Sequence, residues 1–305
     1  MPIGKGIGMM VENLERECVG RTTCETADFV LDRIRALGFK LHPESRLMKM
    51  RNVLFEDDSP RELDPNDIDF AIALEALRDF LHFGFIFDHF DPSLDGEAKQ
   101  RLNIALQDCH LPQDNLENSP GRDAQFELFV AAICSRAQFI PVKFAEPDIQ
   151  VVIPGPEFPE GSQIFGIAAK RIKSVGNFEK NVRKASKQIK KSDLPGVIAI
   201  DTSVALNRDN EAIVKPMELD RFRKLHNKGL RRFIDDYYKR IQEWVRTKGV
   251  RTIVFHDHQI WAHPEQGWTL MSLYMAVDTS RGNQRRNREY EAFWRSYGRG
   301  LPSIR

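Results

Sequence analysis

The chain has 305 residues, of which 41% are hydrophobic and 29% charged, and its formal net charge is +1. This composition predicts one large or two modest folded domains and excludes wholesale disorder. A nearly neutral chain attracts nucleic acid only where its basic residues cluster. No stretch approaches the roughly 18 apolar residues of a membrane-spanning helix, and the amino terminus lacks the apolar core of a secretory signal. We therefore expect a cytoplasmic protein that does not engage a membrane.

Residues 1–118 predict a mostly helical amino-terminal domain. Apolar residues recur at helical spacing through 23–37, and Gly38 ends that pattern. A second helix is predicted over 67–87, and a third precedes a turn-rich linker at 111–123.

The four cysteines form no CxxC pair, which is typical of reduced thiols. Zinc binding is the less favoured alternative, because the spacing of the candidate ligands matches no compact zinc module. Those candidates are Cys18, Cys24, Cys109 and His110.

Residues 119–280 predict a second domain of the α/β class. A helical pattern at 121–137 leads into four apolar segments of strand length, which are 139–144, 148–153, 163–170 and 196–201. Helices are predicted at 175–191 and 217–248, and two further strands at 251–256 and 268–278. This order predicts a mixed central sheet flanked by helices.

Asp148 and Lys170 carry the main chemical signal of this domain. Pro147 holds the chain extended as it enters the strand that begins at Asp148, and Lys170 ends a neighbouring apolar strand. A carboxylate beside a lysine suits metal-assisted phosphodiester cleavage, in which the ion polarises the phosphate and activates water. Mg²⁺ is the natural ion for such an oxygen-ligand site, and Mn²⁺ can take its place.

These residues resemble the PD-(D/E)XK, or restriction-endonuclease-like, superfamily in the order helix, Pro-Asp strand, strand ending in lysine, basic helix and GVIAID. The likeness covers residues 122–201 and extends more loosely to Asp278. It implies a PD-(D/E)XK-like core in which Asp148 and Lys170 are catalytic. It also implies that Glu127 adds a carboxylate to the metal site and that the Ala169 carbonyl faces the ion.

Ala168 departs from the superfamily pattern, because it stands where a carboxylate is expected two residues before the lysine. Three accounts are open. Glu127 supplies the missing ligand, or the activity is weak or lost, or the sequence is altered at its active site. We favour the first, since a metal site tolerates a ligand from another position if count and geometry survive.

A basic segment follows the Lys170 strand and predicts contact with nucleic acid. Its residues Lys170 to Lys191 include a single acidic side chain, Glu179. The alternative is a solvated helix face whose apolar side is buried. The predicted contact residues are Arg171, Lys173, Lys180, Arg183, Lys184, Lys187, Lys190 and Lys191, together with Gln188, which resembles a glutamine that some superfamily members place near the phosphate.

The tail at 281–305 mixes arginines with four aromatic residues, which could stack on bases or dock on the core. His256 and His258 alternate on a strand and could support a second metal or a general base, with His263 nearby.

We expect a metal-dependent nuclease acting on DNA rather than RNA, with restriction or mobile-element defence as an analogy only. Cutting both strands often requires two active sites, so a homodimer is compatible with this reading. The alternatives are a degenerate nuclease fold that binds nucleic acid without cutting it and a phosphohydrolase using the two histidines.

Overall fold

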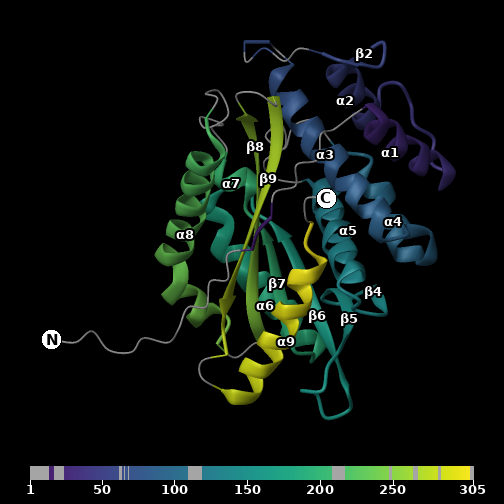
Figure 1. The fold of residues 1–305 in the computed structure, drawn as a ribbon. Helices are drawn as coiled ribbons and strands as arrows, with labels where there is room; N and C mark the ends of the chain where they lie inside the picture. The colour runs from purple at the N-terminus through teal and green to yellow at the C-terminus, as the bar shows by residue number, and fades with distance from the viewer. Residues whose placement is uncertain are drawn as a thin grey trace.

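A seven-stranded mixed sheet lies at the centre of the protein, with helices on both faces (Figure 1). The computed structural model describes residues 14–16, 24–61, 64, 66, 67, 69–108, 119–207, 217–246, 249–263, 267–280 and 283–302. The sheet strands are β1 (Leu14–Arg16), β4 (Val142–Ala145), β5 (Asp148–Pro154), β6 (Ser162–Arg171), β7 (Gly196–Asp201), β8 (Val250–His263) and β9 (Gly267–Asp278). Their spatial order is β1-β9-β8-β7-β6-β5-β4. The pairs β6/β7 and β7/β8 are parallel and the others antiparallel, so the predicted α/β class with a mixed sheet is confirmed.

The helices occupy most of the remaining described chain. They are α1 (Cys24–Ala36), α2 (Arg46–Leu54), α3 (Phe70–His89), α4 (Gly96–Ala105), α5 (Pro120–Arg136), α6 (Phe178–Ser192), α7 (Ser203–Leu206), α8 (Leu219–Trp244) and α9 (Gln284–Gly300). Short 3₁₀ turns lie at Pro92–Leu94 and Val175–Asn177, and β2 (Phe55–Glu56) pairs with β3 (Ser59–Pro60). Within the described chain, no helix has both the length and the apolar character needed to cross a membrane.

Strand β7 is buried along its whole length, because helices cover both of its faces. Val197 and Ala199 join a hydrophobic cluster that includes α3, α5 and α9. Ile198 and Ile200 join a second cluster, which contains α6 and α8. Side chains alternate between the two faces of a strand, so the sheet separates two helical layers.

The amino-terminal helices share a core with the strands that follow them. One hydrophobic cluster includes residues of α1 through α5 and of α9. A buried ion cluster adds to it, in which Arg122 of α5 lies 3.2 Å from carboxylate oxygens of both Glu75 and Asp79 of α3. Strand β1 pairs with β9, so the segment predicted to be a helical domain also contributes an edge strand to the sheet. The predicted division at residue 118 therefore crosses a continuous hydrophobic core.

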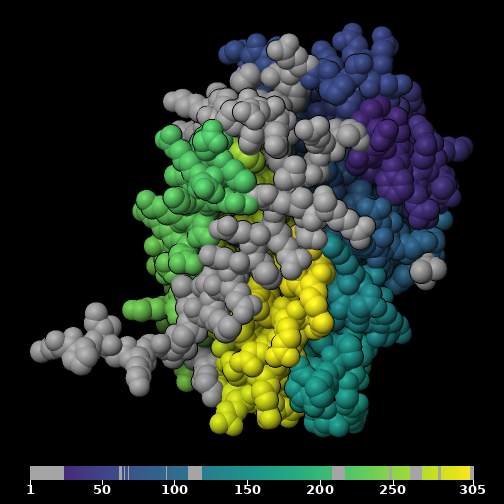
Figure 2. All heavy atoms as spheres, viewed as in Figure 1, coloured from purple at the N-terminus to yellow at the C-terminus, as the bar shows by residue number. Residues whose placement is uncertain are grey.

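The predicted carboxy-terminal tail contains helix α9, which packs against α5 (Figure 2). An added Cβ at Gly300 would lie 2.1 Å from the Ile133 carbonyl oxygen, so only glycine allows this close approach. The aromatic side chains of α9 are at most 4% exposed, which confirms that they dock on the core. They are Tyr290, Phe293, Trp294 and Tyr297.

Candidate catalytic site

Asp148 and Lys170 meet because β5 and β6 are antiparallel neighbours. The register pairs Ile149 with Ile167, which places Asp148 opposite Ala168, two residues before Lys170. The Lys170 Nζ atom lies 2.5 Å from Asp148 Oδ2, and the two side chains are 12% and 11% exposed. The structure therefore brings the two predicted residues together at a largely buried position with limited access to solvent.

Asp148 is held by two further donors. The Ala169 backbone N–H donates to Asp148 Oδ2 at 2.9 Å, and the Gln188 side-chain amide of α6 donates to Asp148 Oδ1 at 3.1 Å. Gln188 also donates to the Pro147 carbonyl oxygen at 2.9 Å. Gln188 thus points toward the carboxylate rather than outward with the lysines of α6. Burial raises the pKa of Asp148, while Lys170 and these hydrogen bonds oppose the rise.

Gly166 lets Pro147 lie against β6 and so helps to place Asp148. A Cβ added at Gly166 would lie 2.7 Å from Pro147 Cδ, which is too close for any other residue without a shift. The Pro-Asp sequence and the β6 glycine therefore act together to fix the start of β5 beside the end of α6.

Glu127 of α5 brings a second carboxylate near Asp148. Its Oε2 atom accepts a 2.6 Å hydrogen bond from Arg101 Nε of α4, and its side chain is 16% exposed. Burial, and then repulsion from Asp148, raise the pKa of Glu127 to about 7, against the opposing effects of Arg101 and Lys170. The charge of Asp148 therefore favours the protonated form of Glu127, and a cation bound between the two carboxylates would favour the charged form.

Arg101 completes this group, although nothing in the sequence pointed to it. It comes from α4, and its guanidinium lies 4.8 Å from the centre of the Phe144 ring. It also pairs with Glu97 at 3.2 Å. Because Arg101 reaches the site across a helix–helix contact, residue spacing along the chain carries no signal for it.

Ala168 is fully buried in the hydrophobic cluster beneath α6. Its neighbours there include Phe178, Val182 and Ile189. The position at which the superfamily pattern expects a carboxylate is thus filled by apolar packing. The site offers two carboxylates, Asp148 and Glu127, and Mg²⁺ is commonly held by one or two carboxylates with several waters. Two carboxylates match the number of anionic ligands that Mg²⁺ or Mn²⁺ commonly takes, and a bound ion would have to replace Lys170 at Asp148 and Arg101 at Glu127. The structure shows the N–H of Ala169 directed at Asp148, and the metal-binding role of its carbonyl remains a prediction.

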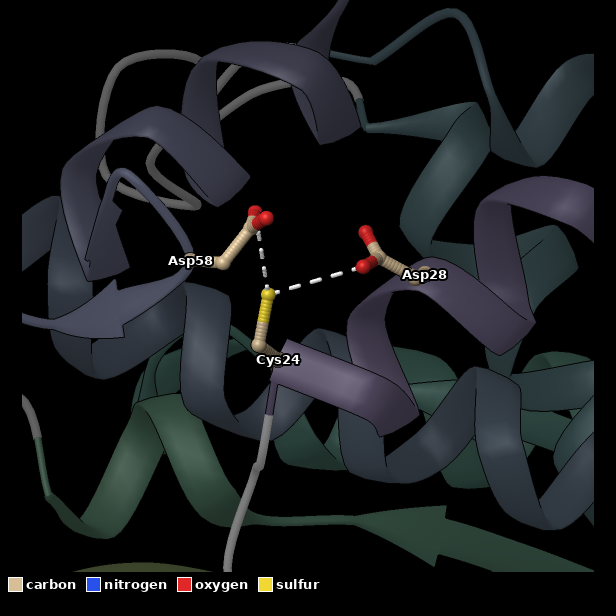
Figure 3. A group of neighbouring side chains, drawn as sticks. All are labelled: Cys24, Asp28 and Asp58. Atoms are coloured by element: carbon tan, nitrogen blue, oxygen red, sulfur yellow. Dashed lines mark hydrogen bonds between the residues drawn. The ribbon is translucent and has the colours of Figure 1, made fainter.

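A tighter group of three metal-compatible side chains lies elsewhere in the described chain (Figure 3). It consists of Cys24, Asp28 and Asp58. Arg51 donates to all three, at 2.8 Å to Asp28, 2.6 Å to Asp58 and 3.3 Å to the Cys24 sulfur. Burial and the neighbouring carboxylates raise the pKa of the Cys24 thiol. The arginine occupies the position of a cation, so this is an ion-pair cluster. The other three residues of the predicted zinc alternative lie outside the described residues.

The predicted basic surface divides into exposed and buried residues. Arg171 lies in the interior, where its Nε atom is 2.8 Å from Asp201 Oδ2, and Lys173 is only 9% exposed. Neither residue belongs to the exposed surface. Arg171 follows Lys170 on a strand, so its side chain faces the opposite side of the sheet. The exposed basic residues of α6 are Lys180, Arg183, Lys184, Lys187, Lys190 and Lys191.

His256 and His258 are fully buried rather than open to a substrate. His258 packs against His82 of α3 with ring centres 4.6 Å apart, and Tyr297 lies 3.2 Å from His256 Nε2. Burial lowers the pKa of both His82 and His256 to about 3, so these rings are neutral at pH 7. They form a buried interlayer contact, which gives the phosphohydrolase alternative no accessible site. The side chain of His263 lies outside the described residues.

Comparison of the chain with protein-family models, with curated proteins and with solved structures gave no match.

Proposed function

We propose that this protein is a metal-dependent nuclease that hydrolyses phosphodiester bonds, with DNA as its preferred substrate. The observation that carries the proposal is the buried contact between Asp148 and Lys170, to which Glu127 of α5 is coupled electrostatically. Lys170 Nζ lies 2.5 Å from Asp148 Oδ2, and burial, followed by the charge of Asp148, raises the pKa of Glu127. A strongly perturbed carboxylate such as Glu127 is characteristic of catalytic centres.

The arrangement of the surrounding elements supports the same proposal. The chain runs from α5 through the antiparallel β4, β5 and β6 to α6 and then to β7, which is parallel to β6. This is the order of elements expected from the sequence resemblance. Asp148 lies on β5, Lys170 on β6 and Glu127 on the preceding helix α5.

In this proposal Asp148 and Glu127 hold a divalent cation. Such an ion, when bound, would lower the pKa of a coordinated water and neutralise charge on the phosphate. Lys170 stabilises the negative charge that develops on the phosphate oxygens. Gln188 and the Ala169 N–H are positioning groups, because they fix the orientation of the Asp148 carboxylate. The exposed lysines of α6 contribute salt-sensitive affinity for the phosphate backbone.

The proposal is tested by incubating the full chain with plasmid DNA, single-stranded DNA and RNA, with and without Mg²⁺ or Mn²⁺. We expect metal-dependent cutting of DNA that is abolished in Asp148→Ala and in Lys170→Ala. Lys99→Ala, an exposed lysine on α4, serves as the control and should cut at the wild-type rate. Cutting that persists without metal, or in both site variants, contradicts the proposal.

A second function is favoured by the packing of Ala168. Because that position is apolar and fully buried, the site has one carboxylate fewer than the superfamily pattern. A nuclease fold that grips nucleic acid without cutting it would show binding that survives Asp148→Ala and no cleavage with either metal.

A further inference from the structure

Helix α8 carries an exposed basic stripe outside the basic segment at 170–191. The stripe follows helical spacing on the side opposite the buried Phe222, His226 and Leu230. No acidic residue occurs between its first and last members. The members, all exposed, are Arg221, Lys224, Lys228, Arg231 and Arg232. Within the part of the chain that the structure describes, none of the five makes an ion pair.

The first half of α8 is held firmly against the sheet. His226 Nε2 lies 2.8 Å from Asp257 Oδ2, and Asp257 also accepts hydrogen bonds from Thr202 and Asn207. The Phe222 ring stacks on Trp261 with centres 5.4 Å apart. The backbone that carries the stripe is therefore already ordered, so binding does not require this backbone to lose further conformational entropy.

Helices α6 and α8 lie side by side on one face of the sheet. Phe178, at the start of α6, contacts Phe233 and Tyr237 in the second half of α8. The first half of α8 therefore extends beyond the start of α6, and the stripe lies in the same helical layer as the lysines of α6, with the exposed Asp235 and Asp236 between Arg232 and Tyr237 on α8. From Arg221 to Arg232 the stripe is about 16 Å long, which is about five base-pair steps.

Charge is strongly concentrated on these two helices. Helix α6 has six basic residues and one acidic residue, and α8 has eight basic and four acidic residues. Together they carry +9 in a chain of net charge +1, so the rest of the protein carries −8. A polyanion is thus attracted to this layer and repelled from the remainder.

We propose that the α8 basic stripe contacts the phosphate backbone of a DNA duplex beside the catalytic site, so that α6 and α8 form one nucleic-acid-binding face. The proposal deepens the proposed function, on which the choice of DNA rests. A duplex fits the observations because the positive charge runs along two adjoining helices rather than around a single pocket. The contact is independent of base sequence, since it involves phosphates alone.

The test measures binding of a fluorescent DNA duplex to the full chain by anisotropy, over a series of salt concentrations and with Ca²⁺ in place of Mg²⁺. The variant is the triple change Lys224→Glu, Lys228→Glu and Arg231→Glu. Its control is the triple change Lys40→Glu, Arg61→Glu and Lys99→Glu, at exposed positions of the amino-terminal region. Both triple variants lower the net charge by the same amount.

We expect the dependence of log affinity on log salt to weaken by about three in the α8 variant, one for each phosphate contact, and to stay near the wild-type value in the control. Equal losses in both variants, or no loss in either, overturn the proposal, as does tighter binding to phosphatidylserine vesicles than to the duplex. If the glutamate variant does not fold, the corresponding glutamine triple variant is measured instead. Plasmid cutting by the wild type is followed in parallel. Absence of cutting defeats the nuclease proposal, whereas stripe-independent binding defeats the α8 proposal alone.

Discussion

Replacing Glu127 with glutamine tests the electrostatics of the candidate site most sharply. The pKa of Glu127 is raised from 4.5 to about 7, so the folded state binds its proton more tightly than the unfolded chain does. Stability is therefore lost as the pH rises from about 4.5 to about 7. The shift corresponds to at most about 3 kcal/mol, reduced by solvent screening because the side chain is 16% exposed. Glu127→Gln has no such proton to lose.

The assay compares the thermal unfolding midpoints of wild type and Glu127→Gln at pH 5 and pH 8. We expect the midpoint of the variant, relative to wild type, to be higher at pH 8 than at pH 5. Glu25→Gln, which changes an exposed carboxylate of α1, should show the same difference from wild type at both pH values. An equal difference for Glu127→Gln at the two pH values would refute the reasoning. In wild type, Mn²⁺ affinity should rise with pH up to about 7, because the ion must displace this proton.

Three further outcomes follow from the same structure. Ala168→Asp places a carboxylate opposite Asp148, so the Mn²⁺ affinity measured by calorimetry should rise about ten-fold. The metal-free variant should melt at a lower temperature than wild type, because the new carboxylate is buried. An unchanged Mn²⁺ affinity would contradict this placement. Burial holds the pKa of His82 and His256 near 3, so stability is full above about pH 6.5 and falls by about 2 kcal/mol per histidine at pH 5. His82→Phe should flatten this fall in melting temperature, and a wild-type midpoint that is constant from pH 7 to pH 5 would count against it. Arg122→Met removes one cation from the buried carboxylates of α3 and should lower the free energy of unfolding by about 3 kcal/mol in thermal melts. A loss below about 1 kcal/mol would mean that the ion cluster does not stabilise the fold.

Much of the fold was predictable because its pattern is local. The run GVIAID is continuously apolar, as a strand buried on both faces must be, and it forms β7. We predicted that this strand ends at His256, because polar residues interrupt the apolar pattern there. Strand β8 instead continues to His263, and the polar residues Asp257 and His258 within it are buried. The pairing of β1 with β9 joins segments that are far apart in the sequence, and no local pattern reveals such a contact.

The candidate site was predictable where it depends on neighbouring strands and unpredictable where it depends on packing between helices. Asp148 and Lys170 meet because their strands are antiparallel neighbours. The burial of Arg171 could have been foreseen from strand alternation, since it faces away from Lys170. Arg101 could not, because its place beside Glu127 is set by how α4 packs on α5.

The central claim is that Lys170 and its carboxylate partners cut a phosphodiester bond. The most direct measurement is the rate of plasmid nicking in Mg²⁺ by wild type and Lys170→Met, with duplex affinity determined on the same samples. We expect the variant to lose at least about 100-fold in rate while its duplex affinity stays within about threefold of wild type. Equal nicking rates in the two proteins, or duplex binding without nicking by the wild type, would contradict the claim.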